Sequence, residues 1–137
     1  MPIEMPSAFT WTVRVYYEDT DAGGIVYYAN YLKFFERART EWLRAIGVDQ
    51  HELAAKHDAM FVVKSATVDY HAPAKLDDVI TLTLGIEKLG RASILFVQQA
   101  TRGETLLASA RVKVGCVDRA VKPRPLPGAV ADKMRAA

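Results

Sequence analysis

The spacing of apolar residues changes once near the start of the chain, from the period of a strand to that of a helix. From Phe9 to Tyr17 every second residue is apolar, which is the pattern of a half-buried β-strand. After Gly23 and Gly24 the spacing becomes three or four, which predicts a long helix that starts near Tyr28 to Asn30 and ends at Gly47. Its apolar stripe comprises Tyr31, Leu32, Phe34, Phe35, Ala38, Trp42, Leu43 and Ile46. A stripe this wide predicts that a sheet encloses the helix.

The remainder of the chain predicts one short helix and four strands. The helix is expected over Asp49 to Lys56, with Asp49 as its N-cap and Glu52 placed as in a capping box. The strands are expected at Met60 to His71, Val79 to Lys88, Ala92 to Thr101 and Thr105 to Val117. Short connections between consecutive strands predict antiparallel pairing. The fold class is therefore α+β, an antiparallel sheet of about five strands wrapped around one long central helix.

Length and charge limit the organisation and the partners. A chain of 137 residues predicts a single domain over residues 1–137. Residues 1–8 form a short lead-in, and residues 119–137 a proline-rich tail with room for a short helix from Gly128 onward. A net charge of +2 argues against a nucleic-acid partner, which would require a basic patch or stripe.

Metal binding and membrane insertion are not expected. The single Cys116 excludes an internal disulfide and a multi-cysteine zinc site, and the histidines at 51, 57 and 71 are not spaced as a metal-ligand set. No apolar run approaches the roughly 20 residues that span a bilayer. The N-terminus lacks the basic and apolar regions of a signal peptide. We therefore expect a cytoplasmic protein with no membrane span.

The acidic turn before the long helix is the strongest candidate for chemistry. Residues 18–24 read EDTDAGG and place carboxylates next to a helix N-terminus, whose N–H groups and dipole favour a negative charge. Asp21 is therefore a candidate reactive carboxylate, although a capping or turn role is equally compatible with its position. Asp19 is interpreted as a turn residue and Glu18 as a solvated one. The serines lie in no G-x-S-x-G elbow, and the glycines match neither a Walker A nor a dinucleotide motif.

This turn and its surroundings resemble the hotdog-fold acyl-CoA thioesterases. The resemblance is to the 4-hydroxybenzoyl-CoA thioesterase group and its Tol-Pal-associated acyl-CoA thioesterase branch, and it extends from about Val13 to Val117. It is carried by the stretches YYEDTDAGGIVYYANY, ERAR, VDYHAPAKLDD and EKLGRASI. In such families the sheet wraps the central helix, two subunits join their sheets edge to edge, and dimers often pair into tetramers. The resemblance thus implies a homodimer or a dimer of dimers with an interfacial active site.

The resemblance also implies roles for individual residues. Asp21 matches the catalytic aspartate, which attacks the thioester directly or activates a water. The backbone N–H of Tyr28 matches the oxyanion donor, a contact worth roughly 3–4 kcal/mol of barrier. Gly24 and Tyr28 are expected to contact the substrate, with Lys88, Arg91 and, less strongly supported, Lys122 and Arg124 at the phosphates of coenzyme A. Coenzyme A enters as part of the substrate, and no separate cofactor is expected.

Much of the Tol-Pal-associated branch carries a histidine where this chain has Tyr28, so a mechanism that uses this histidine is excluded here.

Three further interpretations stay open. Some hotdog thioesterases use a carboxylate on the helix, for which Glu36 or Glu41 would serve. A hotdog hydratase would need a histidine near the helix, and only His71 is a candidate. A non-catalytic acyl-CoA-binding or scaffold subunit is the third alternative. The acyl group, short-chain or aromatic, is not determined by the sequence.

Overall fold

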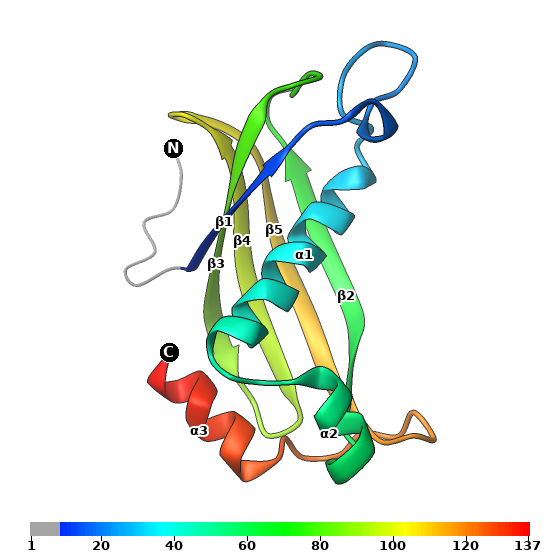
Figure 1. Cartoon of the computed structure of the whole chain (residues 1–137), viewed down its shortest axis with the longest axis vertical. Helices are drawn as coiled ribbons and strands as arrows, with labels where there is room; N and C mark the ends of the chain where they lie inside the picture. Colours follow the sequence, from blue (N-terminus) through cyan, green and yellow to red (C-terminus); the bar gives the residue numbers. More distant parts are fainter. Residues whose placement is uncertain (1–8) are drawn as a thin grey trace.

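The computed structural model describes residues 9–137, in which a five-stranded antiparallel sheet curves around one long helix (Figure 1). The strands are β1 (Phe9–Arg14), β2 (Met60–Tyr70), β3 (Val79–Leu89), β4 (Ser93–Arg102) and β5 (Thr105–Val117). Their order in the sheet is β1-β3-β4-β5-β2. This is the predicted α+β arrangement. The predicted lead-in, residues 1–8, lies outside the described residues.

Only two of the pairs between neighbouring strands are hairpins. β3 pairs with β4 and β4 with β5 through short turns, whereas residues 71–78 carry the chain from β2 to the opposite side of the sheet. β1 and β2 therefore form the two edges, paired with β3 and β5 respectively. The order of the strands places the N-terminal end of α1 beside the C-terminal end of β2.

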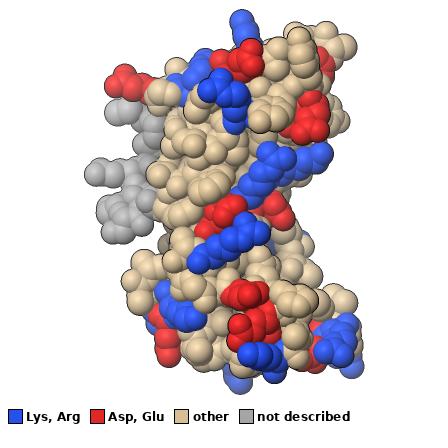
Figure 2. Space-filling model, viewed as in Figure 1, with Lys and Arg blue, Asp and Glu red and all other residues tan. Residues whose placement is uncertain are grey.

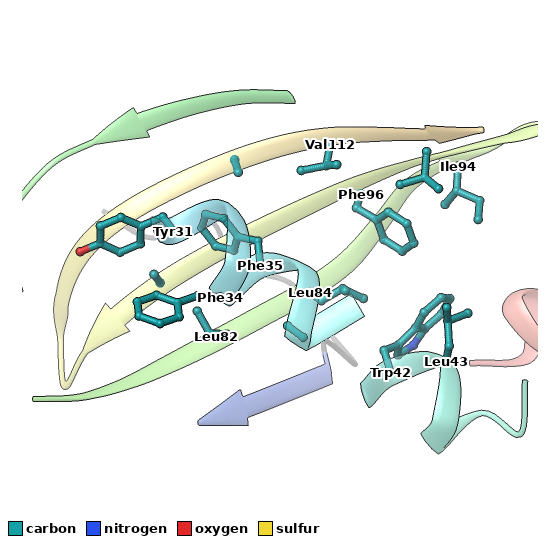
Figure 3. Close-up of a cluster of buried hydrophobic side chains, with 14 of the residues drawn as sticks. Tyr31, Phe34, Phe35, Trp42, Leu43, Leu82, Leu84, Ile94, Phe96 and Val112 are labelled. Atoms are coloured by element: carbon teal, nitrogen blue, oxygen red, sulfur yellow. The ribbon is translucent and has the colours of Figure 1, made fainter. Parts of the chain in front are cut away.

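Helix α1 (Asn30–Ala45) supplies most of the core, as its apolar spacing predicts. Phe34, Phe35 and Ala38 are fully buried against the sheet, and Figure 3 shows Trp42 and Leu43 near Phe96 and Ile94. Leu32 is an exception to the predicted stripe, because 45% of it is exposed. It points outward because the sheet encloses the helix on one side only. The helix ends before Gly47, whose φ of +83° is accessible to glycine at little cost.

The first predicted strand is too long. β1 ends at Arg14, and Tyr17 to Asp19 form a 3-10 turn instead of the strand end. The Asp19 carboxylate accepts a hydrogen bond from the Tyr16 backbone N–H at 2.8 Å, which bends the chain away from β3. Tyr17, predicted to face the core, is consequently 80% exposed.

The two shorter helices lie at the end of the sheet away from the start of α1 (Figure 1). In α2 (Gln50–His57) the Asp49 carboxylate accepts from the Glu52 N–H at 3.1 Å, which is the predicted N-cap. Helix α3 (Gly128–Ala136) occupies the tail, and Lys133 Nζ donates to the Gly47 carbonyl at 2.7 Å. None of the helices described in residues 9–137 is long and apolar enough to cross a membrane.

Two leucines on α1 test the enclosure of the helix. Leu43 is 6% exposed and Leu32 is 45% exposed. We expect Leu43→Ala to lower the free energy of unfolding by about 2–4 kcal/mol, since it removes buried methyl groups and leaves a cavity. Leu32→Ala, the same chemical change, should lower it by less than about 1 kcal/mol. Urea denaturation measures both, and equal losses would contradict the one-sided enclosure.

Tyr31 provides a pH-dependent test of the same core. Its hydroxyl is buried with no hydrogen-bond partner among the described residues, and burial raises its pKa to about 12. The unfolded chain releases this proton near pH 10, so the stability that Tyr31 contributes is complete below pH 10 and is lost as pH rises to 12. We expect Tyr31→Phe to be neutral or stabilising by up to about 2 kcal/mol at pH 7, because it removes an unpaired hydroxyl.

Denaturation of wild type and variant at pH 7 and between pH 10 and 12 measures this effect. The stability of wild type should fall more steeply than that of Tyr31→Phe across the alkaline window. Tyr17→Phe, at an exposed tyrosine, is the matched control and should change neither value. A clear loss of stability in Tyr31→Phe at pH 7 would show that the hydroxyl has a partner.

Candidate active site

The segment between β1 and α1 folds into a narrow hairpin whose legs are residues 19–21 and 25–27. The Asp21 N–H donates to the Ile25 carbonyl at 2.9 Å, and the Tyr27 N–H donates to the Asp19 carbonyl at 2.9 Å. At the tip, the Gly24 N–H donates to the Asp21 carbonyl at 3.0 Å, with Gly24 at a φ of +81°. The hairpin therefore requires glycine at position 24 for its backbone geometry. It sets Asp21 close in sequence and in space to the start of α1.

The Asp21 carboxylate is exposed and only half engaged. Its Oδ1 accepts a hydrogen bond from the Gly23 N–H at 2.8 Å, an Asx turn that fixes the side chain. A Cβ at Gly23 would lie 3.2 Å from this oxygen, so the missing side chain allows the close approach. Within residues 9–137 no hydrogen bond engages Oδ2. One carboxylate oxygen is thus held and the other is available to a ligand.

The backbone N–H of Tyr28 is an unpaired donor at the positive end of α1. The preceding Tyr27 carbonyl accepts from the Asn30 N–H at 2.8 Å, inside the first turn of the helix. Since the peptide between Tyr27 and Tyr28 is planar and trans, its N–H points the opposite way, out of the turn. No acceptor among the described residues takes this N–H. The arrangement can hold a small negative charge.

The Tyr28 carbonyl is also held in place. Tyr70, the last residue of β2, donates its hydroxyl to this carbonyl at 2.9 Å. The Tyr28 side chain itself is 60% exposed and meets the Tyr70 ring edge-on, with centroids 5.9 Å apart. The Tyr27 ring lies 4.8 Å from that of Tyr28. Burial, and then the neighbouring Tyr28, raise the pKa of Tyr70, so its hydroxyl stays a donor at neutral pH.

These tyrosines separate into surface and core groups. Tyr27, Tyr28 and Tyr70 form a partly exposed aromatic surface, whereas Tyr31 is buried, with its ring centroid 5.8 Å from that of Tyr70. Figure 3 shows the Tyr31 hydroxyl directed away from Phe35 and the core. The sequence left the facing of these side chains open. The structure places an aromatic surface directly at the start of α1.

Asp19 and Asn30 are two residues whose importance sequence reasoning missed. Asp19, interpreted as a turn residue, is only 4% exposed, and Asn30 is 6% exposed. Asn30 Nδ2 donates to Asp19 Oδ1 at 2.8 Å, which joins the hairpin to the first residue of the helix. The partners are 11 residues apart and belong to different elements, so no local pattern indicates that they meet.

An ion pair supports the other side of the hairpin. Val26 N–H donates to the Ala74 carbonyl at 2.8 Å, so the hairpin rests on the 71–78 connection. Arg102 fixes that connection by donating to Asp78 at 2.9 Å and to the Pro73 carbonyl at 3.0 Å. The Lys75 backbone N–H, followed by Arg102, lowers the pKa of Asp78 and keeps the carboxylate charged.

The predicted phosphate contacts lie at the opposite end of the sheet. Lys88 and Arg91 are exposed beside the turn between β3 and β4, whereas Asp21 and Tyr28 lie beyond the C-terminal end of β4 (Figure 1). Arg124 is at the same end as Lys88, but its guanidinium donates to the Pro125 carbonyl at 2.8 Å and to the His57 carbonyl. The structure therefore joins Asp21 and Gly24 in one hairpin that leads to Tyr28, and within one chain the basic residues lie at the other end of the sheet.

None of the other candidates named from the sequence has a recorded contact with Asp21 or Tyr28 within residues 9–137. Glu41 pairs with Arg44 at 2.7 Å on the helix surface, and Glu36 borders a cavity of about 190 Å³ between the middle of α1 and β2. His71 Nε2 lies 3.0 Å from Ser109 Oγ, on the face of β5 opposite to its buried neighbours Ala108 and Ala110. In residues 9–137 no group of three metal-ligating side chains is present. Burial raises the pKa of the Cys116 thiol.

The face of the molecule seen in Figure 2 carries interspersed basic and acidic side chains, with broad areas of uncharged residues between them. A hollow of about 820 Å³ lies beside β3 and α3 near Leu84 and Met134, and none of the candidate residues lines it. Asp21, Gly24 and Tyr28 are exposed in the single chain.

Most of the chain is similar to a group of known proteins. Residues 15–134 match the model of the thioesterase-like superfamily. An acyl-CoA thioesterase YbgC of Haemophilus influenzae is 48% identical over 83% of this chain and 84% of its own. An acyl-CoA thioester hydrolase YbgC of Escherichia coli O6:H1 is 50% identical over 89% and 92%. A probable thioesterase of Bartonella henselae, known from its crystal structure, superposes with a TM-score of 0.85 at 35% identity, over 88% of this chain and 100% of that one.

These matches confirm the hotdog fold and the family resemblance. They extend beyond the junction to the sheet and the tail helix, since the matched range ends within α3. The relatives that are similar in sequence and the solved structure that is similar in shape are all thioesterases by name. The chain belongs to the thioesterase-like superfamily.

Proposed function

We propose that this protein hydrolyses the thioester of a short-chain or aromatic acyl-CoA to the free acid and coenzyme A, with Asp21 as the reactive carboxylate. One observation carries the proposal. Within residues 9–137, the Asp21 carboxylate has no hydrogen bond at Oδ2 and the Tyr28 N–H has no acceptor, and both belong to the short segment that leads into the positive end of α1. Thioester hydrolysis needs both a nucleophile or base and a donor for the carbonyl oxygen. The names of the YbgC relatives support the same reaction.

Two routes use this geometry. In one, Asp21 Oδ2 attacks the carbonyl carbon, the Tyr28 N–H receives the developing oxyanion, and coenzyme A leaves as a thiolate. Water then hydrolyses the resulting mixed anhydride. In the other, Asp21 takes a proton from a water that attacks the same carbon. A thiol has a pKa near 8.5, so the thiolate leaves without a strong acid. This explains how a tyrosine at position 28 suffices where a histidine would otherwise carry a proton.

The aromatic surface bears on the acyl group. Tyr27, Tyr28 and Tyr70 expose their rings beside the proposed reacting groups. Aromatic groups gain about 0.5–1.5 kcal/mol from offset or edge-on contacts beyond the area that they bury. An aroyl group has more to gain here than a straight chain of equal length. This favours aromatic acyl groups within the proposed class.

A second copy of the chain is part of the proposal. Lys88 and Arg91 are roughly 30 Å from Tyr28 along the ten residues of β4, a gap longer than the pantetheine arm. β2 is an edge strand, and a two-fold axis through it would place its N-terminal half beside the C-terminal half of the partner strand. The end that carries Lys88 and Arg91 then approaches the partner's site. We propose a homodimer or a dimer of dimers, with the cytoplasm as the location predicted from the sequence.

The catalytic role of Asp21 can be tested by one substitution. Asp21→Asn keeps an oxygen that accepts from Gly23 and removes the charge, so the hairpin should persist. We expect turnover to fall at least about a hundredfold, the usual scale for a positioned acid–base group. Thiol release from a panel of short-chain and aromatic acyl-CoA esters measures it. The control Glu18→Gln, at a solvated neighbour, should retain full turnover. Retained activity in Asp21→Asn would refute the assignment, and an inert wild type would favour a binding or scaffold subunit.

The basic residues predict a different kinetic signature. We expect Arg91→Ala to raise the KM for acyl-CoA several-fold with little change in kcat, because a phosphate contact binds ground and transition states alike. With acyl-pantetheine, which lacks the phosphates, wild type and Arg91→Ala should have equal constants. A wild type that binds both esters equally well would argue against any phosphate contact.

Mixed dimers test whether the phosphate contact crosses between subunits. Dimers formed from Asp21→Asn and Arg91→Ala chains contain one doubly altered site and one intact site if each site uses both chains. The mixture should then show turnover at the wild-type KM. If each site lies within one chain, only the Arg91→Ala sites turn over, and their KM is raised. A monomer at micromolar concentration in sedimentation would contradict the interfacial site.

A further inference from the structure

A buried carboxylate without a cation lies immediately behind the proposed oxyanion donor. Asp19 is 4% exposed, and its two oxygens accept from the Tyr16 N–H and from Asn30 Nδ2, both at 2.8 Å. Among residues 9–137 no lysine, arginine or histidine forms an ion pair with it. Burying a charge with neutral partners alone is costly. A neutral side chain would fill the same turn at lower cost, so the carboxylate calls for an explanation.

We infer that Asp19 and Asn30 are a positioning pair that sets the direction of the Tyr28 N–H for the reaction. The inference rests on the proposed function, in which that N–H receives the oxyanion. Neither residue touches the substrate. They act through Tyr27, whose carbonyl and whose amide are both held by the pair.

The hydrogen bonds form a closed set around Tyr27. Its N–H donates to the Asp19 carbonyl at 2.9 Å, and its carbonyl accepts from the Asn30 N–H at 2.8 Å. The side chains of Asp19 and Asn30 close the set through their own 2.8 Å bond. The Tyr27 carbonyl and the Tyr28 N–H belong to one rigid peptide plane, so the orientation of the first dictates that of the second. The helix start and the hairpin leg cannot shift relative to one another without breaking the set.

The chemistry of the pair explains why an acid stands at position 19. A carboxylate accepts at both oxygens, and here it must accept from a backbone N–H on one side and from an amide on the other. An asparagine at position 19 has one acceptor and would turn an NH₂ group toward a donor. If position 30 then carried an aspartate, that NH₂ group would regain an acceptor, while the oxygen still served Tyr16. Exchanging the two side chains therefore preserves both bonds and the net charge.

Steady-state kinetics of Asp19→Asn, Asn30→Asp and the exchanged double variant test the inference. Each single variant should lower kcat by roughly tenfold to a hundredfold, as expected for a misplaced group. The KM for acyl-CoA should stay within about twofold, since the lost interaction exists only in the transition state. The double variant should recover most of the wild-type kcat. A role confined to folding would lower the apparent kcat only in proportion to the folded fraction, so kcat corrected for that fraction would stay at the wild-type value.

Stability is monitored in parallel so that loss of fold is not mistaken for misplacement. Turnover is normalised to the folded fraction from circular dichroism, well below the melting temperature. Phe96→Leu, a core change in β4 where the ring packs on Trp42 of α1, is the control that should lower the melting temperature and leave kcat unchanged. If Asp19→Asn does not fold, Asn30→Ala carries the test, because it leaves the carboxylate and its bond to Tyr16 in place.

The outcomes separate this inference from the function on which it rests. If Asp21→Asn is inactive while the folded single variants of the pair keep wild-type kcat, the positioning role is overturned and the proposed function stands. A double variant that folds but does not recover also overturns it. If Asp21→Asn retains activity, the catalytic assignment fails whatever the pair variants do.

Discussion

The hydrogen bond between the buried Asp19 carboxylate and the Asn30 side-chain amide connects the hairpin of the candidate site to the central helix. On one side, Asn30 opens the helix that fills the sheet. On the other, Asp19 ends the 3-10 turn that leads the chain out of β1. Because one bond joins both, the packing energy of α1 also stabilises the hairpin that carries Asp21. This bond therefore ties the hairpin to the helix that packs in the core, although the tip of the hairpin is exposed.

Near the start of α1, the orientation of N–H groups matters more for negative charge than the presence of positively charged side chains does. The free N–H of Tyr28 and the positive end of α1 favour a negative charge outside the helix, whereas the carboxylate of Asp19 is held behind it. The Asp21 carboxylate keeps one oxygen on Gly23 and the other toward solvent. Two carboxylates, Asp19 and Asp21, thus lie near one helix end, and within residues 9–137 neither is paired with an arginine or lysine. Their hydrogen-bond donors are the backbone N–H groups of Tyr16 and Gly23 and the side-chain amide of Asn30.

Local signals in the sequence predicted elements well, and contacts between elements poorly. The bounds of β5 and the end of α1 at Gly47 were predictable, because alternation and a positive-φ glycine are properties of a few adjacent residues. The motif around Asp21 was recognisable for the same reason. The burial of Asp19 depends on Asn30, 11 residues away, and the exposure of Leu32 depends on where the sheet stops. The predicted first strand was too long because Tyr17 continues the apolar alternation, although the hydrogen bond from the Tyr16 N–H to the Asp19 carboxylate has already turned the chain.

The edge strand β2 relates the site to assembly. Its register is irregular between Val63 and Ser65, where a bulge interrupts pairing, and it is regular from Ser65 to Tyr70. The regular stretch offers unpaired backbone groups along an edge, which proteins rarely leave uncovered. Pairing it with a two-fold copy would run Ser65 against the copy's Tyr70, the residue whose hydroxyl holds the Tyr28 carbonyl. The strand that would form this interface thus also carries the hydroxyl that holds the Tyr28 carbonyl, so pairing at this edge would bear on the geometry of the candidate site.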